Sequence, residues 1–438
     1  MVGARRTIGT LAGACAVLLA AAGPAPAEEP EAPPTPRPYG MASDAQPVEG
    51  TASTSDAPRI SAGGIYTDGL EPGDSLYYSL ALDDESSAYL ATVAAPEPGT
   101  KVGYGDGIEV ELVTTSGDRC GGGPGRARFQ ADNGARPIAA WAVRTADPDR
   151  DCQSAGPYLY KVTRESDATS SPEVWPIEIR FLEEPPVPRP DRRVPDERDW
   201  ETEPPAPPAG DATRVVGGTG FSNAPAIGDG VWRDNIVGGQ TLIYKMPVDW
   251  GQQLAVTVEL ANASGADDFA YVSYGLMAEL YNPALGLLIS DSTAYSGDQT
   301  SLSGLTPGVS HANRFHSDTD IGRMRYAGWH YLVVTLHEDI AQETEEPIGL
   351  TLRTQLLGEP QEAPEYEGDA LEAGFGVTEE QREQAEKGRS DEDLSADRQD
   401  GKQLMGFAGI GAGSALLLVL GAWYLKGRRE AAPSGRQQ

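Results

Sequence analysis

The sequence predicts an all-β protein with two tandem antiparallel β-sandwich domains, jelly-roll-like, followed by one C-terminal transmembrane helix. Three observations predict this class. Apolar residues alternate with less apolar ones at every second position, two long segments resemble each other, and residues 403–425 form an apolar stretch without charge. A chain of 438 residues is long enough for two or three domains of ordinary size.

The N-terminus has the features of a secretory signal. Arg5 and Arg6 precede an apolar run, and the small residues before Glu28 match what a signal peptidase accepts, with Ala27 at the cleavage point. We therefore predict that residues 1–27 are removed and that Cys15 leaves with them. Acylation of Cys15 is the alternative, although Ala12 replaces the leucine expected of a lipoprotein signal.

The C-terminal stretch 403–425 is long enough for a helix to cross about 30 Å of hydrocarbon. Trp423 and Tyr424 lie at its end, where aromatic rings favour the membrane interface. The tail at 426–438 is basic, which places it in the cytoplasm by the positive-inside rule. The sequence thus predicts a single-pass type I protein of the cell membrane, bound to the membrane through its own helix, with the N-terminal ectodomain outside.

Three segments have the composition of unfolded chain. Residues 28–59 and 184–212 are rich in proline, and residues 359–402 are rich in acidic side chains. Proline-rich segments form semi-rigid extended spacers, and like charges keep a chain extended. We predict a disordered N-terminal segment, a linker and an acidic stalk, respectively.

Between these segments lie two copies of one module, at 60–183 and 213–358. Residues 64–78 align without gaps on residues 230–244, and residues 156–162 align on residues 328–334. In all, four such blocks occur in the same order in the two copies, which indicates an internal repeat.

Within each copy the apolar period is two. Leu76, Tyr78, Leu80 and Leu82 alternate with less apolar residues, as Leu254, Val256, Val258 and Leu260 do in the second copy. Such alternation, interrupted by Gly, Pro, Asn and Asp, is typical of half-buried antiparallel strands. Each module is therefore predicted to be a β-sandwich with its own core.

Short motifs in both copies resemble bacterial pre-peptidase C-terminal (PPC) modules. The motifs are a Pro-Gly-Asp-x-x-Tyr-Tyr element at 72–78, an Ala-Glu-Leu-Tyr strand at 278–281 and a Gly-x-x-Tyr-Leu-x-Val strand at 328–334. The resemblance implies jelly-roll-like, non-catalytic accessory domains of the kind attached to secreted enzymes.

Cys120 and Cys152 are the cysteines left after removal of the signal, and both lie in the first module. An even number of cysteines in an oxidising compartment favours a disulfide. Redox catalysis is disfavoured because the chain has no Cys-x-x-Cys sequence.

The balance of 34 basic and 66 acidic residues gives a formal net charge of -32. Phosphate recognition needs a basic surface, so this charge excludes a nucleic-acid partner. Ser75 lies in a Gly-Asp-Ser-Leu sequence like that of one esterase family, but no histidine follows an aspartate at the spacing that chemistry needs. We predict no catalytic residues, no cofactor and no metal ligand, leaving open a structural calcium ion at the recurring Asp68 and Asp234.

Tryptophans supply the remaining signal for a ligand, because exposed rings stack on sugars. Trp232 and Trp329 are the candidates for such stacking. The sequence favours a non-catalytic, membrane-anchored binding or scaffolding protein of a bacterial envelope, with an envelope protein as partner. One alternative is a cell-wall or polysaccharide-binding protein, and a second is a secreted-type hydrolase.

Overall fold

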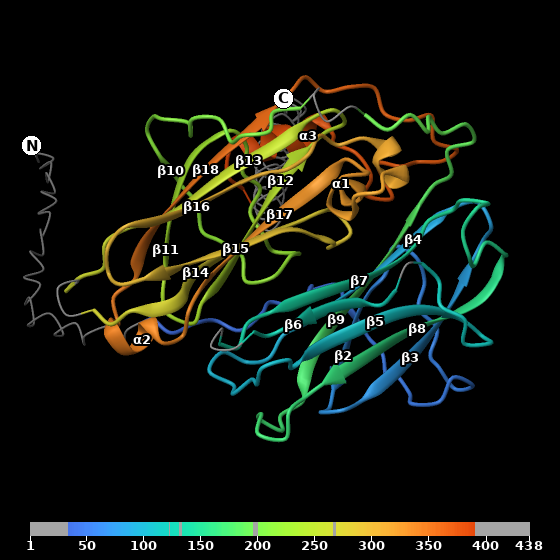
Figure 1. Ribbon diagram of the computed structural model, residues 1–438, viewed down its shortest axis with the longest axis horizontal. Coiled ribbons are helices and arrows are strands. Elements are labelled where there is room, and N and C mark those ends of the chain that lie inside the picture. Colours follow the sequence, from blue (N-terminus) through green and yellow to red (C-terminus); the bar gives the residue numbers. More distant parts are fainter. Residues whose placement is uncertain (1–33, 122, 131–133, 196–199, 266–268, 390–438) are drawn as a thin grey trace, which may run out of the picture. The chain divides into compact units, whose positions relative to one another are not determined.

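The computed structural model describes residues 34–121, 123–130, 134–195, 200–265 and 269–389 (Figure 1). The predicted signal cleavage at Ala27, the predicted span at 403–425 and the basic tail lie outside these residues. Within the described part of the chain, no helix is both long and apolar enough to cross a bilayer.

Module 1 is built from two sheets whose strands pair mostly antiparallel. One sheet has the order β1-β2-β9-β4-β7 and the other β3-β8-β5-β6. The strands are β1 (Gln46–Pro47), β2 (Ile65–Leu70), β3 (Ser75–Leu82), β4 (Ser87–Ala94), β5 (Gly107–Thr114), β6 (Gly125–Arg128), β7 (Ile138–Arg144), β8 (Gly156–Glu165) and β9 (Trp175–Glu184).

Module 2 repeats this arrangement. Its sheets have the orders β10-β11-β18-β13-β16 and β12-β17-β14-β15. The strands are β10 (Thr213–Arg214), β11 (Gly230–Ile236), β12 (Thr241–Val248), β13 (Gln253–Leu260), β14 (Val272–Tyr281), β15 (Leu287–Tyr295), β16 (Thr300–Leu305), β17 (Gly328–Leu336) and β18 (Ile348–Leu357). Short helices are η3 (His311–Phe315), α1 (Thr319–Arg323), α2 (Ile340–Glu343) and α3 (Glu379–Glu386).

The two modules agree in register as well as in strand order. In module 1, Leu76 of β3 is opposite Val162 of β8, and in module 2 the aligned Leu242 of β12 is opposite Val334 of β17. The prediction of an all-β protein made of sandwiches is confirmed, since each module encloses an apolar core between its two sheets.

Two strands depart from the half-buried pattern. Every residue of β4 and of β12 is buried. The outer face of β4 presents Ala91 and Val93 to a cluster that includes Ile243 of β12 and Val333 of β17. The five-stranded sheet of module 1 therefore packs on the four-stranded sheet of module 2, and small apolar side chains take the place of the polar ones expected on an outer face.

The described part of the N-terminal segment, 34–59, differs from the disordered chain that the sequence predicts. Strand β1 pairs in parallel with β2, and Ile60 N–H donates to Ser79 O at 2.9 Å, as Ile227 N–H does to Lys245 O in module 2. Module 1 thus begins near residue 46 rather than 60. The composition misled because a segment paired through its backbone needs few large apolar side chains.

The described residues of the Pro-rich linker 184–212 also contact the modules. Glu201 N–H donates to Gln253 Oε1 at 2.8 Å, and Arg353 donates to Pro208 O at 2.7 Å. Proline carbonyls accept hydrogen bonds as well as any others, so a Pro-rich segment can lie fixed along a folded surface.

The predicted stalk is ordered over residues 359–389, here called the strap. Phe375 is 1% exposed, and Arg382 of α3 donates to Asp249 Oδ2 at 2.6 Å. Thr378 and Gln381 form a capping box that begins α3. Acidic composition predicted an extended chain, but the strap's carboxylates are mostly solvent-exposed while Tyr366, Ala370, Ala373 and Phe375 pack against the core. Residues 390–402 lie outside the described part.

Candidate functional site

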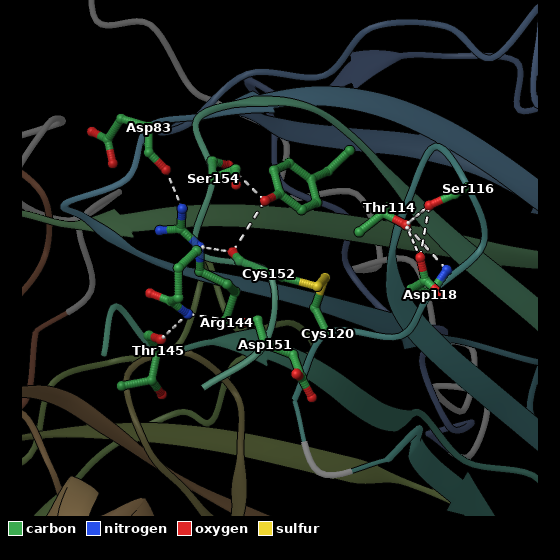
Figure 2. Close-up of a disulfide and its surroundings, with 12 residues drawn as sticks. Asp83, Thr114, Ser116, Asp118, Cys120, Arg144, Thr145, Asp151, Cys152 and Ser154 are labelled. Atoms are coloured by element: carbon green, nitrogen blue, oxygen red, sulfur yellow. Dashed lines mark hydrogen bonds between the residues drawn. A yellow bond between two sulfur atoms is a disulfide. The ribbon is translucent and has the colours of Figure 1, made fainter. Parts of the chain in front are cut away.

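The predicted disulfide between Cys120 and Cys152 is confirmed, with an S–S distance of 2.06 Å (Figure 2). It joins the loop after β5 to the loop between β7 and β8. The carbonyl of Cys152 accepts hydrogen bonds from Arg144 Nε at 3.1 Å and from Tyr158 Oη at 3.0 Å. The disulfide is therefore part of a polar network that fixes this loop against the sheet.

The structure does not present the predicted tryptophans as an exposed stacking pair. Trp232 is 3% exposed and donates through Nε1 to Gly228 O at 3.0 Å, so its ring lies in the core and the sequence-based assignment was wrong. Trp329 is half-buried, with Lys245 Nζ 4.6 Å from its ring centroid. No described tryptophan is exposed.

The recurring Asp68 and Asp234 have one structural role in both modules. Asp68 Oδ2 accepts from Tyr78 Oη at 2.8 Å and from Gly50 N–H at 2.7 Å, and Asp234 Oδ2 accepts from Tyr244 Oη and Gly217 N–H at the same two distances. Burial, and next the charge of Asp68, raises the pKa of Tyr78, which keeps its hydroxyl protonated as a donor. These aspartates tie the start of each module to its second sheet.

The remaining candidate groups are dispersed. Ser75 Oγ lies 3.0 Å from Thr163 Oγ1, and all four histidines belong to module 2. His330 is buried and its Nδ1 lies 3.1 Å from Gly328 O, while burial lowers its pKa to about 4. The described residues contain no group of three or more His, Cys, Asp or Glu side chains placed to hold a metal ion.

The junction between the modules centres on a buried carboxylate. Glu184, at the end of β9, is 1% exposed and accepts from Arg314 Nη2 at 2.7 Å and from Arg314 Nη1 at 3.1 Å. Tyr89 Oη of module 1 and Tyr366 Oη of the strap donate to it at 2.7 and 2.8 Å. Burial acts to raise the pKa of Glu184, but the charge and hydrogen bonds of Arg314 outweigh it and hold the pKa below its usual range.

Aromatic rings surround this ion pair. The Tyr89 ring lies 5.0 Å from Tyr326 of module 2 and 5.7 Å from Phe375 of the strap, centroid to centroid. Module 1, module 2 and the strap therefore meet at a single residue. Such a junction restricts motion between the sandwiches, because separating them would expose a paired charge and its aromatic shell.

A cleft with a volume of about 810 Å³ opens beside the junction and is here called the strap cleft. The linker and the strap form its two sides, with Trp250 and the loop before η3 between them. Glu362, Glu365 and Glu367 of the strap line it, facing Arg189 and Arg193 of the linker. Arg193 is itself paired with Asp191 at 2.9 Å, so the strap side contributes an excess of negative charge.

Exposed tyrosines were missed by the sequence reasoning. Tyr104 is 80% exposed and Tyr271 is 73% exposed, and each precedes the aligned strand β5 or β14. Tyr274 is 39% exposed and has a positive φ of 52°, a conformation that is uncommon for a residue with a side chain. Tyr104 could have been found from its place in a Gly-containing turn, where a large ring has no core to enter, whereas Tyr274 lies within β14 and no sequence pattern marks it.

No protein-family model matches the chain, and a search of curated proteins found no match. Among solved structures, the CUB1-EGF-CUB2 domain of human MASP-1/3 aligns at 7% identity over 66% of this chain and 99% of that one, with a TM-score of 0.15. The CBM22-1-CBM22-2 tandem domain of Paenibacillus barcinonensis Xyn10C aligns at 10% identity over 68% and 92%, with a TM-score of 0.17. TM-scores this low assign the chain to neither fold.

Proposed function

We propose that this chain is a non-catalytic binding protein of a bacterial envelope, anchored in the membrane by residues 403–425, with its two sandwiches outside. The observation that carries the proposal is the Glu184 junction. It joins both modules and the strap into one unit, as expected of a scaffold that presents a fixed surface rather than of two independent domains on a flexible tether.

The ordered strap shortens the segment that separates the folded part of the chain from the predicted membrane span. The sequence alone gave a stalk of residues 359–402, whereas only residues 390–402 separate the ordered strap from the predicted span. Such a segment spans at most about 45 Å when fully extended. The proposed partner is therefore a protein that reaches the outer surface of the membrane itself, rather than one in a distant layer of the envelope.

The strap cleft is the proposed site for that partner. It is open and elongated between two extended segments, and its carboxylates favour an extended segment that carries lysine or arginine. Because exposed charges contribute more to association rate and specificity than to affinity, we expect binding to weaken markedly with added salt.

The test is photo-crosslinking in intact cells from a crosslinker placed at Ala363, with Thr54 on module 1 as the matched control position. We expect an adduct of one defined protein from Ala363 only, and its loss in the Glu362→Gln, Glu365→Gln, Glu367→Gln triple variant. Equal adducts from both positions, or an adduct that the triple variant keeps, would contradict the assignment of the cleft.

A second function is favoured by the exposed tyrosines. Tyr104 and Tyr271 occupy corresponding loops of the two modules, and tyrosine rings in such loops can stack on sugars. Co-sedimentation of the purified chain with peptidoglycan tests this function. If the tyrosines bind sugars, the wild-type chain should co-sediment with peptidoglycan and the Tyr104→Ser, Tyr271→Ser, Tyr274→Ser variant should not. The strap-cleft variant should still co-sediment.

A further inference from the structure

Corresponding loops of the two modules meet at the junction. Residues 145–155 connect β7 to β8 in module 1, and residues 306–327 connect β16 to β17 in module 2. Arg325 Nη1 donates to Thr145 Oγ1 at 3.2 Å, and Arg150 Nη2 donates to Arg314 O at 3.4 Å. The two loops enclose a cleft of about 250 Å³, here called the arginine cleft, which shares no lining residue with the strap cleft.

Four arginines line the arginine cleft, in a chain whose formal net charge is -32. Two of them have carboxylate partners. Arg314 pairs with Glu184, and Arg150 lies 3.8 Å from Asp147. The Arg314 pair is close and buried, whereas Arg150 is 47% exposed and its contact with Asp147 is longer, so its guanidinium stays accessible to a ligand.

The other two arginines donate hydrogen bonds only to neutral groups, although carboxylates interact with them through space. Asp83 and Glu183 interact electrostatically with Arg144, and Glu184 does so with Arg325. Arg144 is 1% exposed and donates to the backbone carbonyls of Asp83, Ser86 and Cys152, two of which appear with it in Figure 2. Arg325 donates to Gly322 O and to Thr145 Oγ1. Among the described residues, neither guanidinium forms an ion pair with a carboxylate.

The acidic residues of the arginine cleft do not neutralise these charges. Asp151 and Asp318 line it but are exposed. Asp318 also accepts from Asp320 N–H at 2.8 Å as the cap of α1. Burial lowers the pKa of Arg325 and the charge of Arg314 acts in the same direction, while Tyr89, Tyr326 and Glu184 act against them.

We propose that the arginine cleft binds a small oxyanion, a phosphate or carboxylate group, through Arg325 and Arg150 at the contact between the two modules. A planar guanidinium offers paired N–H donors that match two oxygens of such a group. Partly buried positive charge that has no directly hydrogen-bonded carboxylate is costly, and an anion that accepts hydrogen bonds from it relieves part of that cost. A cleft of about 250 Å³ has room for a small anion such as phosphate or acetate.

The arginine cleft is separate from the proposed partner site in the strap cleft. Because it exists only where the two loops meet, anion binding there is linked to the contact between the modules. An anion held between Arg150 of module 1 and Arg325 of module 2 contacts both modules at once. Because a ligand stabilises the state that binds it, the anion would strengthen the junction.

The test is isothermal titration of the purified full-length chain, kept in mild detergent, with inorganic phosphate at constant ionic strength set by sodium chloride. A second titration with acetate separates a phosphate site from a carboxylate site. We expect one saturable site for at least one of the two anions, and an affinity at least tenfold weaker in Arg325→Gln. Arg126→Gln, which removes an exposed arginine paired with Glu109 at 2.7 Å, is the matched control and should leave the affinity unchanged.

Because Arg325→Gln also disturbs the junction, a second variant keeps the result interpretable. The Arg150 side chain is 47% exposed, so Arg150→Gln should keep the wild-type unfolding midpoint and still weaken anion binding several-fold. Absence of saturable binding for both anions would overturn the proposal. So would equal losses in Arg150→Gln and Arg126→Gln, since the effect would then be one of general charge.

Discussion

The two modules hold the same loop by different means. In module 1, the loop at 145–155 is covalently tied by Cys152 to Cys120. In module 2, the corresponding loop at 306–327 has no cysteine and forms η3 and α1 instead. Asn313, which is fully buried, donates through Nδ2 to Gly308 O at 2.8 Å and to Met324 O at 2.7 Å, which closes that loop by hydrogen bonds.

This difference indicates which of the two loops depends on contacts with the other module and the strap. The disulfide network of module 1 lies within that module, whereas Tyr326 of module 2 packs on Tyr89 of module 1 and on Phe375 of the strap. A covalent link allows a loop to be stable alone, while a packed loop needs the surface it packs against. Module 2 is therefore the half whose stability should respond most to the junction.

The largest effect is expected at Glu184, the contact on which module 2 depends. Glu184→Gln leaves the Arg314 guanidinium buried without a counterion, and breaking a buried pair in this way costs about 3–5 kcal/mol. Urea unfolding of the full-length chain, followed by tryptophan fluorescence, measures the loss. Hydrogen exchange should show it first in residues 306–327.

Glu183→Gln is the matched control, since the Glu183 side chain is half-buried next to Glu184 in the sequence but forms no ion pair within the described part of the chain. It should change the free energy of unfolding by less than about 0.5 kcal/mol. Similar losses for the two variants would show that the junction does not depend on the ion pair.

The next effect concerns the covalent link of module 1. Replacing both Cys120 and Cys152 by serine removes a cross-link over a sequence separation of 32, worth about 3–4 kcal/mol in the chain-entropy model. We expect faster hydrogen exchange in residues 145–155 and little change in module 2. Equal acceleration in both modules would mean that the two loops do not differ in independence.

Sequence reasoning succeeded where the signal is local and periodic. The period of two and the aligned blocks at 64–78 and 230–244 predicted both sandwiches, because alternation follows directly from strand geometry. The disulfide followed from counting cysteines in an oxidising compartment.

The junction could not be predicted from the sequence, for two physical reasons. Glu184 and Arg314 are far apart in the chain, so their pairing depends on how the sandwiches pack and leaves no local pattern. The composition of the strap is acidic, yet two aromatic side chains, Tyr366 and Phe375, fix its position on the modules. The capping box at Thr378 and Gln381 was the one readable sign of order there.

A third prediction concerns the pH dependence of stability, which should differ between the modules because every histidine lies in module 2. Burial lowers the pKa of His330 from 6.5 to about 4, so the unfolded chain binds a proton that the folded chain does not as pH falls through this interval. Stability is complete above pH 6.5 and is lost by about 1.4 kcal/mol per pH unit below it.

Between pH 7 and pH 5 the loss from His330 should reach about 2 kcal/mol. His330→Gln should flatten this part of the stability curve, as measured by urea unfolding at half-unit steps of pH. Hydrogen exchange should place the wild-type acid sensitivity in module 2. An unchanged slope in His330→Gln would assign the sensitivity to other groups, of which His311, with its pKa lowered by burial to about 3, is the first to replace.

The smallest effect tests the feature that the modules share. Asp68→Ala and Asp234→Ala each remove an acceptor from a buried tyrosine hydroxyl and from a glycine N–H, which should cost about 1–3 kcal/mol. Because the two sets of distances are the same, the two losses should agree within about 0.5 kcal/mol. If these carboxylates instead held calcium, millimolar calcium would raise the unfolding midpoint of the wild type and not of the variants. We expect no such rise, because each Oδ2 already accepts two hydrogen bonds and the chelating geometry of a cation site would have to break them.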